Sequence, residues 1–481
     1  MLFNSFSFPI FLLITVIVYY LIKSKYRIAW IFLCSIYFYF SLKPEYPIII
    51  LFAILMNYFV GIILSKVNEK NKKLLLIIAI SLNLAMLIAF KYLNFFSDSI
   101  RDLFNIFKIQ FEPFFAKILF PIGISFYTFQ NISYLVDIYR KKIEPEEDIL
   151  IFSVYTIFFP KFISGPIERP DKLIPQLKQE HSFDKQAFNS GILRIIWGLF
   201  KKVVVADRVA LLVNMVYSHP NEYSSPAIIL ATLFFAIQLY LDFSGYTDIA
   251  IGSARLFRIN LTENFKRPYF SKSVSEFWKR WHISLSSWFQ DYVFVPLYIK
   301  VSKIKKFARL NSKTRHIISF IISILIGEVL LGLWHGANWT FVLFGLYYGI
   351  AISVYYLIRS KWDNLNKYIQ IAFTFVLINI AWIFFRANSI EDVKNIFFIL
   401  ASKVSLSLIN TNFQFGIADL MIVLPAILII LLFEILQETN KLENLSNNLP
   451  KFLRYLIYIL LIICILVFGL FTPVQFLYAK F

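Results

Sequence analysis

The stretch that decides the fold of this chain is Leu330-Leu331-Gly332-Leu333-Trp334-His335-Gly336-Ala337-Asn338-Trp339-Thr340-Phe341. It places His335 between two apolar runs, each long enough to cross a bilayer. Ionisable groups at membrane depth are costly, so they usually face a cavity or a partner. Histidine can enter a membrane neutral, because its ordinary pKa is about 6.5. A neutral imidazole is also the commonest general base. His335 is therefore either a catalytic candidate or a histidine bonded to a neighbouring helix.

The composition excludes a soluble protein. Of the 481 residues, 59% are hydrophobic and only 16% are charged, and the mean hydropathy is +0.67. Apolar runs of about 20 residues separated by short charged turns are typical of an all-α, polytopic membrane protein. The first run, Phe6–Ile22, has no small-residue cleavage site after it, so we expect a retained span rather than a signal peptide.

The formal net charge of +19 comes from basic clusters between the apolar runs. This distribution follows the positive-inside rule and argues against nucleic-acid binding. We expect the basic loops Lys23–Arg27, Lys66–Lys73 and Lys300–Arg315 to be cytoplasmic and the N-terminus external. The two cysteines, Cys34 and Cys464, lie inside apolar runs, so neither a disulfide framework nor a zinc site is indicated.

The apolar runs predict about ten to twelve transmembrane helices with additional interfacial or re-entrant helices. Arg101–Lys117 mixes aromatic and charged residues and is expected to lie along the interface. Ile149–Ile167 is too interrupted for a plain span and suits a re-entrant or broken helix. Gln186–Val216 carries two central lysines and is not a simple lipid-facing span. The candidate spans are Phe6–Ile22, Ile28–Leu42, Tyr46–Leu64, Leu74–Phe90, Leu119–Val136, Pro226–Phe243, Ile317–Leu333, Trp339–Ile358, Tyr368–Phe385, Gly416–Leu436 and Leu453–Phe471.

A second histidine lies in tryptophan-rich sequence, within an interfacial or cavity-facing helix expected over Glu276–Tyr298. On one continuous helix, Trp278 and His282 would share a face. Lys279 and Arg280 beside aromatic rings suit an anionic ligand, such as the phosphates of a coenzyme or a lipid. An interfacial anchor helix would explain the tryptophans and the basic residues but not the histidine. The other three histidines, for which no special role is expected, are His181, His219 and His316.

A third polar group ends the run Pro226–Phe243, where Asp242 and Tyr246 share a helical face and Asp248 follows. Buried carboxylates must be paired, so a basic or hydroxyl partner is expected for them. Asp242 could pin a broken helix or orient a catalytic imidazole, and the structural role is favoured. Phosphate-binding glycine loops, paired metal ligands and nucleophile elbows are absent from the sequence.

Taken together, these segments resemble the membrane-bound O-acyltransferase (MBOAT) family, and within it the branch that O-acetylates alginate (AlgI-like). Any single piece is weak, but the ordered set is specific. A glutamine would be expected after Pro160, where this chain has Lys161. The matching pieces are Gly123–Gln130, Gly165–Arg169, Gly198–Lys202, Asp242–Tyr246, Asn264-Phe265, Phe277–His282 and Leu333–Gly336.

The resemblance implies one MBOAT domain over residues 1–481, with N-terminal spans (1–96), a motif core (119–349) and C-terminal spans (350–481). It implies a ring of tilted helices around a central funnel, with His335 as the catalytic residue and His282 as the second histidine of the family. It further implies transfer of an acyl group, expected to be acetyl, from a cytoplasmic thioester such as acetyl-CoA. A periplasmic or extracellular SGNH-type acetyltransferase would complete O-acetylation of an exported polysaccharide such as alginate. The location implied is the inner membrane, and no bound cofactor is expected.

The residues suit this chemistry. Acyl transfer to a hydroxyl needs a base, donors for the oxyanion and exclusion of water. His335 can be the base, while the Asn338 amide and the indoles of Trp334 and Trp339 are candidate donors. Lys279 and Arg280 could meet donor phosphates, and no metal is required. Two alternatives stay open, a D-alanyl transferase of the DltB type and, from another class, a transporter or flippase.

Overall fold

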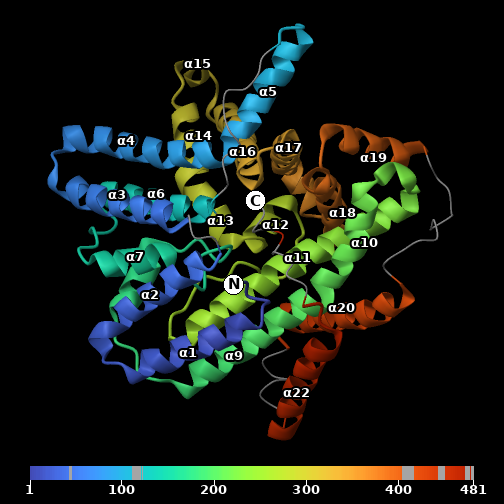
Figure 1. The fold of residues 1–481 in the computed structure, drawn as a ribbon. Helices are drawn as coiled ribbons and strands as arrows, with labels where there is room; N and C mark the ends of the chain where they lie inside the picture. Colours follow the sequence, from blue (N-terminus) through green and yellow to red (C-terminus); the bar gives the residue numbers. More distant parts are fainter. Residues whose placement is uncertain are drawn as a thin grey trace. The chain divides into compact units, whose positions relative to one another are not determined.

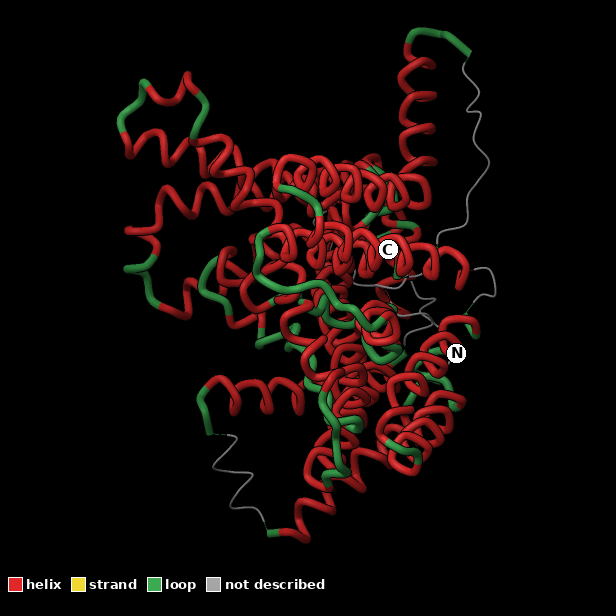
Figure 2. The backbone as a smooth tube through the Cα atoms, turned by 90° about the vertical axis from the view of Figure 1, so that its left-hand side faces the viewer, coloured by secondary structure: helices red, strands yellow, loops and turns green. Residues whose placement is uncertain are grey.

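The computed structural model describes residues 1–42, 46–110, 121, 123–402, 416–441, 450–471 and 477. All regular structure within these ranges is helical, and no strand occurs in them (Figure 2). The predicted all-α class is thereby confirmed. The chain forms two compact units, the first made of residues 1–192 with 250–262 and the second of residues 193–249 with 263–477.

The first unit contains the helices that precede residue 193 (Figure 1). Helix α3 packs closely on α6, because Gly61 leaves room for the Tyr134 ring, which a Cβ would approach to 2.7 Å. α2 packs on α7, and α4 packs on α6. The helices of this unit are α1 (Ser7–Leu21), α2 (Arg27–Phe40), α3 (Tyr46–Lys66), α4 (Glu69–Leu87), the π-turn η2 (Ile88–Tyr92), α5 (Leu93–Ile106), α6 (Ile124–Tyr139), α7 (Ile149–Ile157), α8 (Pro170–Lys178) and the first half of α9 (Lys185–Leu199).

The second unit carries the histidine segments (Figure 1). Its helices are η3 (Phe200–Ala206), α10 (Asp207–Ser218), α11 (Ser225–Arg255, up to residue 249), α12 (Val274–Arg280), α13 (Ile283–Phe289), η6 (Gln290–Phe294), α14 (Val295–Ser302), α15 (Lys305–Ala308), α16 (Ser312–His335), α17 (Trp339–Trp362), α18 (Lys367–Arg386), α19 (Ile390–Ser402), α20 (Ile417–Glu438) and α22 (Lys451–Phe468).

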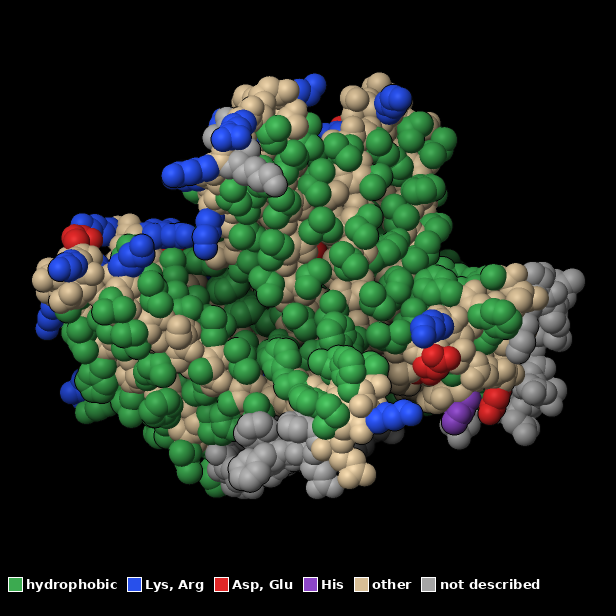
Figure 3. Space-filling view, turned by 90° about the horizontal axis from the view of Figure 1, so that it is seen from above, with side chains coloured by type: hydrophobic (Ala, Val, Ile, Leu, Met, Phe, Trp, Pro, Cys, Tyr) green, Lys and Arg blue, Asp and Glu red, His purple; other side chains and the backbone are tan. Residues whose placement is uncertain are grey.

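Seven helices among the described residues are long and apolar enough to cross a membrane. Two more apolar helices, α1 and the end of α22, are shorter. The chain is therefore a multi-pass membrane protein, although fewer helices meet the length criterion than the ten to twelve predicted. The seven are Pro47–Lys66, Glu69–Ile106, Ser225–Arg255, Ser312–His335, Trp339–Trp362, Lys367–Arg386 and Ile417–Glu438. Figure 3 shows apolar side chains over most of the visible face, with many Lys and Arg side chains along its upper and left edges and a few beside Asp and Glu side chains at the lower right.

Several predicted boundaries are wrong. The run predicted to end at Phe90 continues, because α4, η2 and α5 form one 38-residue helix that ends at Ile106; the interfacial location expected for Arg101–Lys117 stays a prediction, and residues 111–120 lie outside the described ranges. α11 extends 31 residues, to Arg255, without a break at Asp242. The Glu276–Tyr298 helix is interrupted at Trp281, where α12 ends. In contrast, the broken segment at 149–167 is confirmed: α7 stops at Ile157, and the residues after it are buried without helical structure.

The α16–α17 hairpin is held together by close backbone contact. A Cβ on Gly332 would lie 2.2 Å from the Phe341 carbonyl oxygen, and one on Gly345 would lie 2.2 Å from the Glu328 carbonyl oxygen. Small residues at such positions let membrane helices approach closely. This packing fixes the end of α16, and with it His335, against the first turns of α17.

Candidate active site

His335 is the last residue of α16, and its imidazole is buried with 1% exposure. The turn that follows is closed by Asn338, which caps α17: its Oδ1 accepts a hydrogen bond from the Thr340 N–H at 3.0 Å. The Asn338 amide also donates to the carbonyl of Asn388 at 2.9 Å. Asn338 was predicted to be an oxyanion donor. In this structure its side chain caps α17 and binds the backbone of the α18–α19 turn. Trp339, the other flanking residue, is half-exposed at 50%.

His282 occupies the break between α12 and α13. Its φ of 43° lies in the left-handed region, where histidine is enriched among the few non-glycine residues that adopt it. Asn264 holds this conformation: its carbonyl accepts from the Ile283 N–H at 3.0 Å, and its Oδ1 accepts from the Ser284 hydroxyl at 2.6 Å. The predicted shared face of Trp278 and His282 is therefore wrong, because Asn264 fixes a bend where a continuous helix was expected.

The two histidines meet in one aromatic cluster. The Trp334 ring lies 5.0 Å from the His335 ring and 5.9 Å from the His282 ring, centroid to centroid. Phe344 and Phe385 contact His335 at 5.6 Å and 5.3 Å. His282 also contacts the Phe243 ring of α11 at 4.7 Å, nearly perpendicular to it. The structure therefore brings together three predicted site residues, His282, Trp334 and His335, in apolar surroundings that exclude water.

Burial sets the charge of His282. Its side chain is fully buried and lies outside the candidate spans. Removal from water disfavours the imidazolium and lowers the pKa of His282 to about 3. The ring is therefore neutral at physiological pH, a form in which one ring nitrogen is a donor and the other an acceptor. Within the described ranges no group of three or more His, Cys, Asp and Glu residues could hold a metal ion.

A pocket of about 360 Å³ borders the cluster. Its lining contains Leu331, one turn before His335, and Ile283, next to His282. Trp278 also lines it and packs on Tyr348 at 5.0 Å. The remaining lining residues come from α12 to α14 and from α16 and α17: Ser275, Lys279, Ser286, Ser287, Phe289, Gln290, Phe294, Phe320, Ile324, Gly327, Glu328 and Ile352.

A second, wider pocket of about 630 Å³ shares Ser275, Lys279 and Phe320 with the first. It is polar and carries three cations, Lys272, Lys279 and Arg359. Its acidic residues are Glu276 and Asp363, of which Asp363 pairs with Arg359 at 3.2 Å. The three shared lining residues make the two pockets neighbours, and neither His282 nor His335 is among the residues that line them.

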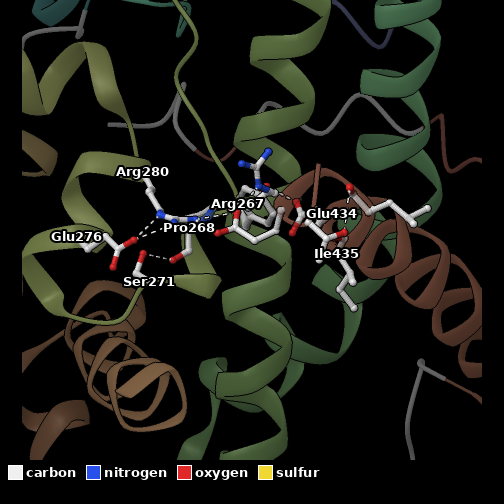
Figure 4. A network of polar contacts seen from close by, with 11 residues as sticks. Arg267, Pro268, Ser271, Glu276, Arg280, Glu434 and Ile435 are labelled. Atoms are coloured by element: carbon white, nitrogen blue, oxygen red, sulfur yellow. Dashed lines mark hydrogen bonds and ion pairs between the residues drawn. The ribbon is translucent and has the colours of Figure 1, made fainter. Parts of the chain in front are cut away.

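The two predicted phosphate ligands differ in their surroundings. The Arg280 guanidinium lies between two carboxylates, donating to Glu276 at 2.9 Å and to Glu438 of α20 at 3.0 Å. Arg267 donates to the same Glu438 at 2.5 Å, and Figure 4 shows Arg280, Glu276 and Arg267 in this network. Lys279, in contrast, is exposed and lines both pockets. Arg280 thus anchors the end of α12, and Lys279 is the cation that faces the pockets.

Asp242 has the basic partner that the sequence predicted. Its Oδ1 pairs with Lys202 in the π-turn η3, and its Oδ2 accepts from the Leu477 N–H at 2.8 Å. Lys202 also pairs with Asp207 at 2.8 Å. Six residues further along α11, Asp248 accepts from Lys201 at 2.8 Å and Arg194 at 3.0 Å. Both carboxylates thereby fasten α11 to the α9–η3–α10 helix, which is the structural role favoured for Asp242.

The match with known proteins agrees with this geometry. Residues 146–391 match the model of the membrane-bound O-acyltransferase family, which is half of the chain. The chain belongs to the membrane-bound O-acyltransferase family. It is an enzyme that transfers acyl groups, which removes the transporter or flippase alternative. The matched region contains all the predicted site residues of this MBOAT protein, from Asp242 to Trp339.

Curated relatives extend the match over most of the chain. The "Probable alginate O-acetylase AlgI" of Pseudomonas putida is 33% identical over 394 residues, covering 81% of this chain and 77% of that protein. The peptidoglycan O-acetyltransferase of Helicobacter pylori is 32% identical, covering 76% of this MBOAT chain and 72% of the relative. The teichoic acid D-alanyltransferase of Bacillus subtilis is 27% identical over 52% of this chain and 62% of its own length. The alginate O-acetylation branch named from sequence is therefore a close match.

Sequence reasoning missed the residues that place the histidines. The sequence identified Asn264 only as part of a family motif. Its hydrogen bond with Ser284, 20 residues away, could not be predicted from the neighbouring residues. Phe344 and Phe385 look like ordinary span residues, and their contact with His335 arises from helix packing. Glu328 carried a usable signal, because a carboxyl seven residues before His335 on the same helix is costly within a membrane.

Proposed function

We propose that this protein transfers an acetyl group from a cytoplasmic thioester, through the membrane core, towards the hydroxyl groups of an exported polysaccharide, with His335 as general base. The observation that carries this proposal is the cluster of His335, Trp334 and His282, whose neighbours Leu331 and Ile283 line the narrower pocket. The cluster places an imidazole, which can act as a base, among apolar rings. Acyl transfer from a thioester needs such a setting, because water would otherwise hydrolyse the thioester.

In the proposed step, a neutral His335 accepts the proton of the acceptor hydroxyl while its oxygen attacks the thioester carbonyl. The imidazolium then returns the proton to the departing thiolate, so that an ester and a thiol result. The indole N–H of Trp334, whose ring contacts His335, is our candidate for stabilising the oxyanion. His282 acts as a positioning residue from the other side of the same indole.

The donor occupies the two neighbouring pockets. Lys272, Lys279 and Arg359 at the wide polar mouth provide cations for the phosphates of a donor such as acetyl-CoA. The narrower pocket, of about 360 Å³, takes the thioester arm. Neither histidine lines this pocket and both imidazoles are buried, so a lining side chain such as Leu331 must move before the thioester reaches His335.

The acceptor is proposed from the relatives. An alginate O-acetylase and a peptidoglycan O-acetyltransferase both modify glycans, and both cover more than three quarters of this chain. An acceptor outside the cytoplasm implies a protein of the inner membrane, with an SGNH-type acetyltransferase as partner. The second candidate, D-alanyl transfer, is favoured less, because the relatives with that name cover only about half of the chain.

Replacing the base tests the function. His335→Ala should reduce O-acetylation of the surface polysaccharide by at least about 10²-fold, because general-base catalysis is typically worth 10²–10⁴-fold. The measurement is mass analysis of the polysaccharide at equal protein level in the membrane. His219→Ala, which changes an exposed loop histidine, is the matched control and should acetylate normally. Undiminished acetylation by His335→Ala would remove His335 from the mechanism, and D-alanyl esters in place of acetyl esters would establish the second candidate.

A further inference from the structure

Glu328 is a carboxyl group inside a membrane span that no step of the proposed mechanism uses. It lies on α16 and lines the narrower pocket together with Leu331 and Gly327. Its Oε2 atom is inaccessible to solvent and accepts no hydrogen bond from any residue in the described part of the chain. A polar side chain in such a place costs free energy, and intramembrane carboxyls usually mark a functional pathway. Glu328 is therefore a candidate for contact with whatever fills the pocket.

The helix geometry relates Glu328 to the catalytic end of α16. Seven residues separate it from His335, and seven residues on an α-helix return to nearly the same face. At about 1.5 Å per residue, the Cα of Glu328 lies about 10 Å from that of His335 along the axis. On α16 the pocket is lined by residues from Phe320 to Leu331, so Glu328 and Leu331 lie at the end of this row that is nearest to His335. A group held by Glu328 thus belongs to a ligand whose reacting atom is about 10 Å further towards His335.

We propose that Glu328 accepts a hydrogen bond from an amide N–H in the pantetheine arm of the acyl donor. This inference rests on the proposed function and assigns one of its contacts. The second amide nitrogen of such an arm is seven bonds from the thioester sulfur. An extended chain advances about 1.2 Å per bond, as a peptide backbone does, so this nitrogen lies about 8 Å from the sulfur. That separation matches the spacing of Glu328 and His335.

Two further lining residues of the pocket complete the amide contacts. Ser275 and Gln290 can donate to the amide carbonyls of the arm, whereas the Ser286 and Ser287 hydroxyls already donate to the carbonyls of Trp281 and Ser284. Lys279 stands where the pocket opens into the polar mouth, in position for phosphate. Glu328 accordingly selects donors by their amides, independently of the acyl group and of the nucleotide. A thioester without amides gains nothing from this carboxyl.

The test compares donors on the purified full-length protein in detergent or nanodiscs. The donors are acetyl-CoA, S-acetyl-pantetheine and S-butyl thioacetate, of which the last has no amide. Glu328→Leu removes the acceptor with a side chain that a membrane span accommodates. Glu328→Gln keeps one carbonyl acceptor. Ile326→Ala, on the exposed side of the same helix, is the control for general damage to α16.

Glu328→Leu should raise KM for acetyl-CoA and S-acetyl-pantetheine about tenfold, with kcat within about twofold. This pattern is expected when the deleted hydrogen bond stabilises the bound donor and the transition state equally. KM for S-butyl thioacetate should be the same in wild type and variant. Glu328→Gln should stay within about threefold of wild type, and Ile326→Ala should match wild type with every donor.

Two results would overturn the proposal while the proposed function stands. One is an equal rise in KM for the amide-free donor, which would assign Glu328 to the shape of the pocket. The other is a collapse of kcat at unchanged KM, which would place the carboxyl in the chemistry. Failure of the proposed function looks different: wild type and His335→Ala would then be equally inactive with all three thioesters, and the assignment of Glu328 would fall with it.

Discussion

The two histidines of the cluster differ in what holds them. His335 is placed by a helix end, and its neighbours are the rings of Trp334, Phe344 and Phe385. His282 is placed by a left-handed backbone conformation, which costs free energy for a side chain with a Cβ and persists only where the surroundings enforce it. Asn264 provides that enforcement. His282, whose backbone is strained, is therefore the histidine to which we assign a positioning role, and His335 is the proposed base.

The buried imidazole of His282 makes the folded protein sensitive to acid. Its pKa is about 3 when folded and about 6.5 when unfolded, so the unfolded chain binds the proton first as the pH falls. The folded state then loses up to about 1.4 kcal/mol per pH unit between pH 6.5 and pH 3. His282→Gln removes this loss, so its melting temperature should fall less than that of wild type between pH 7 and pH 4.5, measured by tryptophan fluorescence.

His219→Gln is the control for this pH experiment, because His219 is exposed, and its melting curve should follow wild type. Parallel acid profiles for wild type and His282→Gln would contradict the expected burial of a neutral imidazole.

At the residue scale, the sequence predicted types of residue better than partners. Histidines and a carboxylate in apolar runs are informative because burial restricts what they can do, and Asp242 does have a basic partner. Which partner it has depends on the π-turn that brings Lys202 inward, and no local pattern encodes that turn. Arg280 is a second example of a partner that the sequence did not predict. Its guanidinium was expected to bind phosphate, but it donates to Glu438, 158 residues away.

Among the elements, the α16–α17 hairpin carries the site, and its contact depends on glycine. A Cβ on Gly332 would overlap the Phe341 carbonyl oxygen at 2.2 Å, whereas a Cβ on Gly327, on the same helix, meets nothing within 4 Å. Gly332→Ala should therefore lower the melting temperature and the acetylation activity, with a cost of about 1–3 kcal/mol for the forced separation. Gly327→Ala should be neutral or stabilising by about 0.5–1 kcal/mol, since glycine is a poor helix former.

The pair is informative because both variants make the same chemical change on one helix. Melting temperatures measured in the same detergent, with acetylation in cells, check the two together. Equal effects of Gly332→Ala and Gly327→Ala would show that the hairpin tolerates separation, and the placement of His335 would then need another cause.

At the element scale, the apolar runs located most helices correctly, because a span must satisfy its backbone internally and therefore needs a long apolar sequence. The breaks were harder to predict. The helix expected over Glu276–Tyr298 is interrupted because Asn264 binds the backbone of Ile283 and the side chain of Ser284, contacts about 20 residues apart in sequence. The end of α11 was also missed, since its last turns are polar yet buried by packing.

For the whole molecule, helical class and membrane insertion follow from the sequence, because a backbone in lipid must be satisfied internally and continuous apolar runs of about 20 residues have the length of spanning helices. The number of crossings does not follow, since α2 has 14 residues and the α9–η3–α10 helix carries buried ion pairs. A count of apolar runs does not distinguish a short helix such as α2, or a helix with buried ion pairs, from a transmembrane helix. The ring around a central funnel and the single domain of residues 1–481 stay predictions.

Sidedness is the remaining property of the whole molecule, and it decides the direction of acyl transfer. Basic residues resist export, so the loop Lys300–Arg315 should be cytoplasmic and the N-terminus external. Ser7 and Lys303 are exposed in the structure and suit a labelling experiment. With Cys34 and Cys464 changed to alanine, Ser7→Cys should react with a membrane-impermeant maleimide on intact cells, and Lys303→Cys should react only after permeabilisation. The reverse pattern would place the basic pocket mouth outside the cell, where no acyl-CoA is available, and the donor path proposed here would have to run the other way.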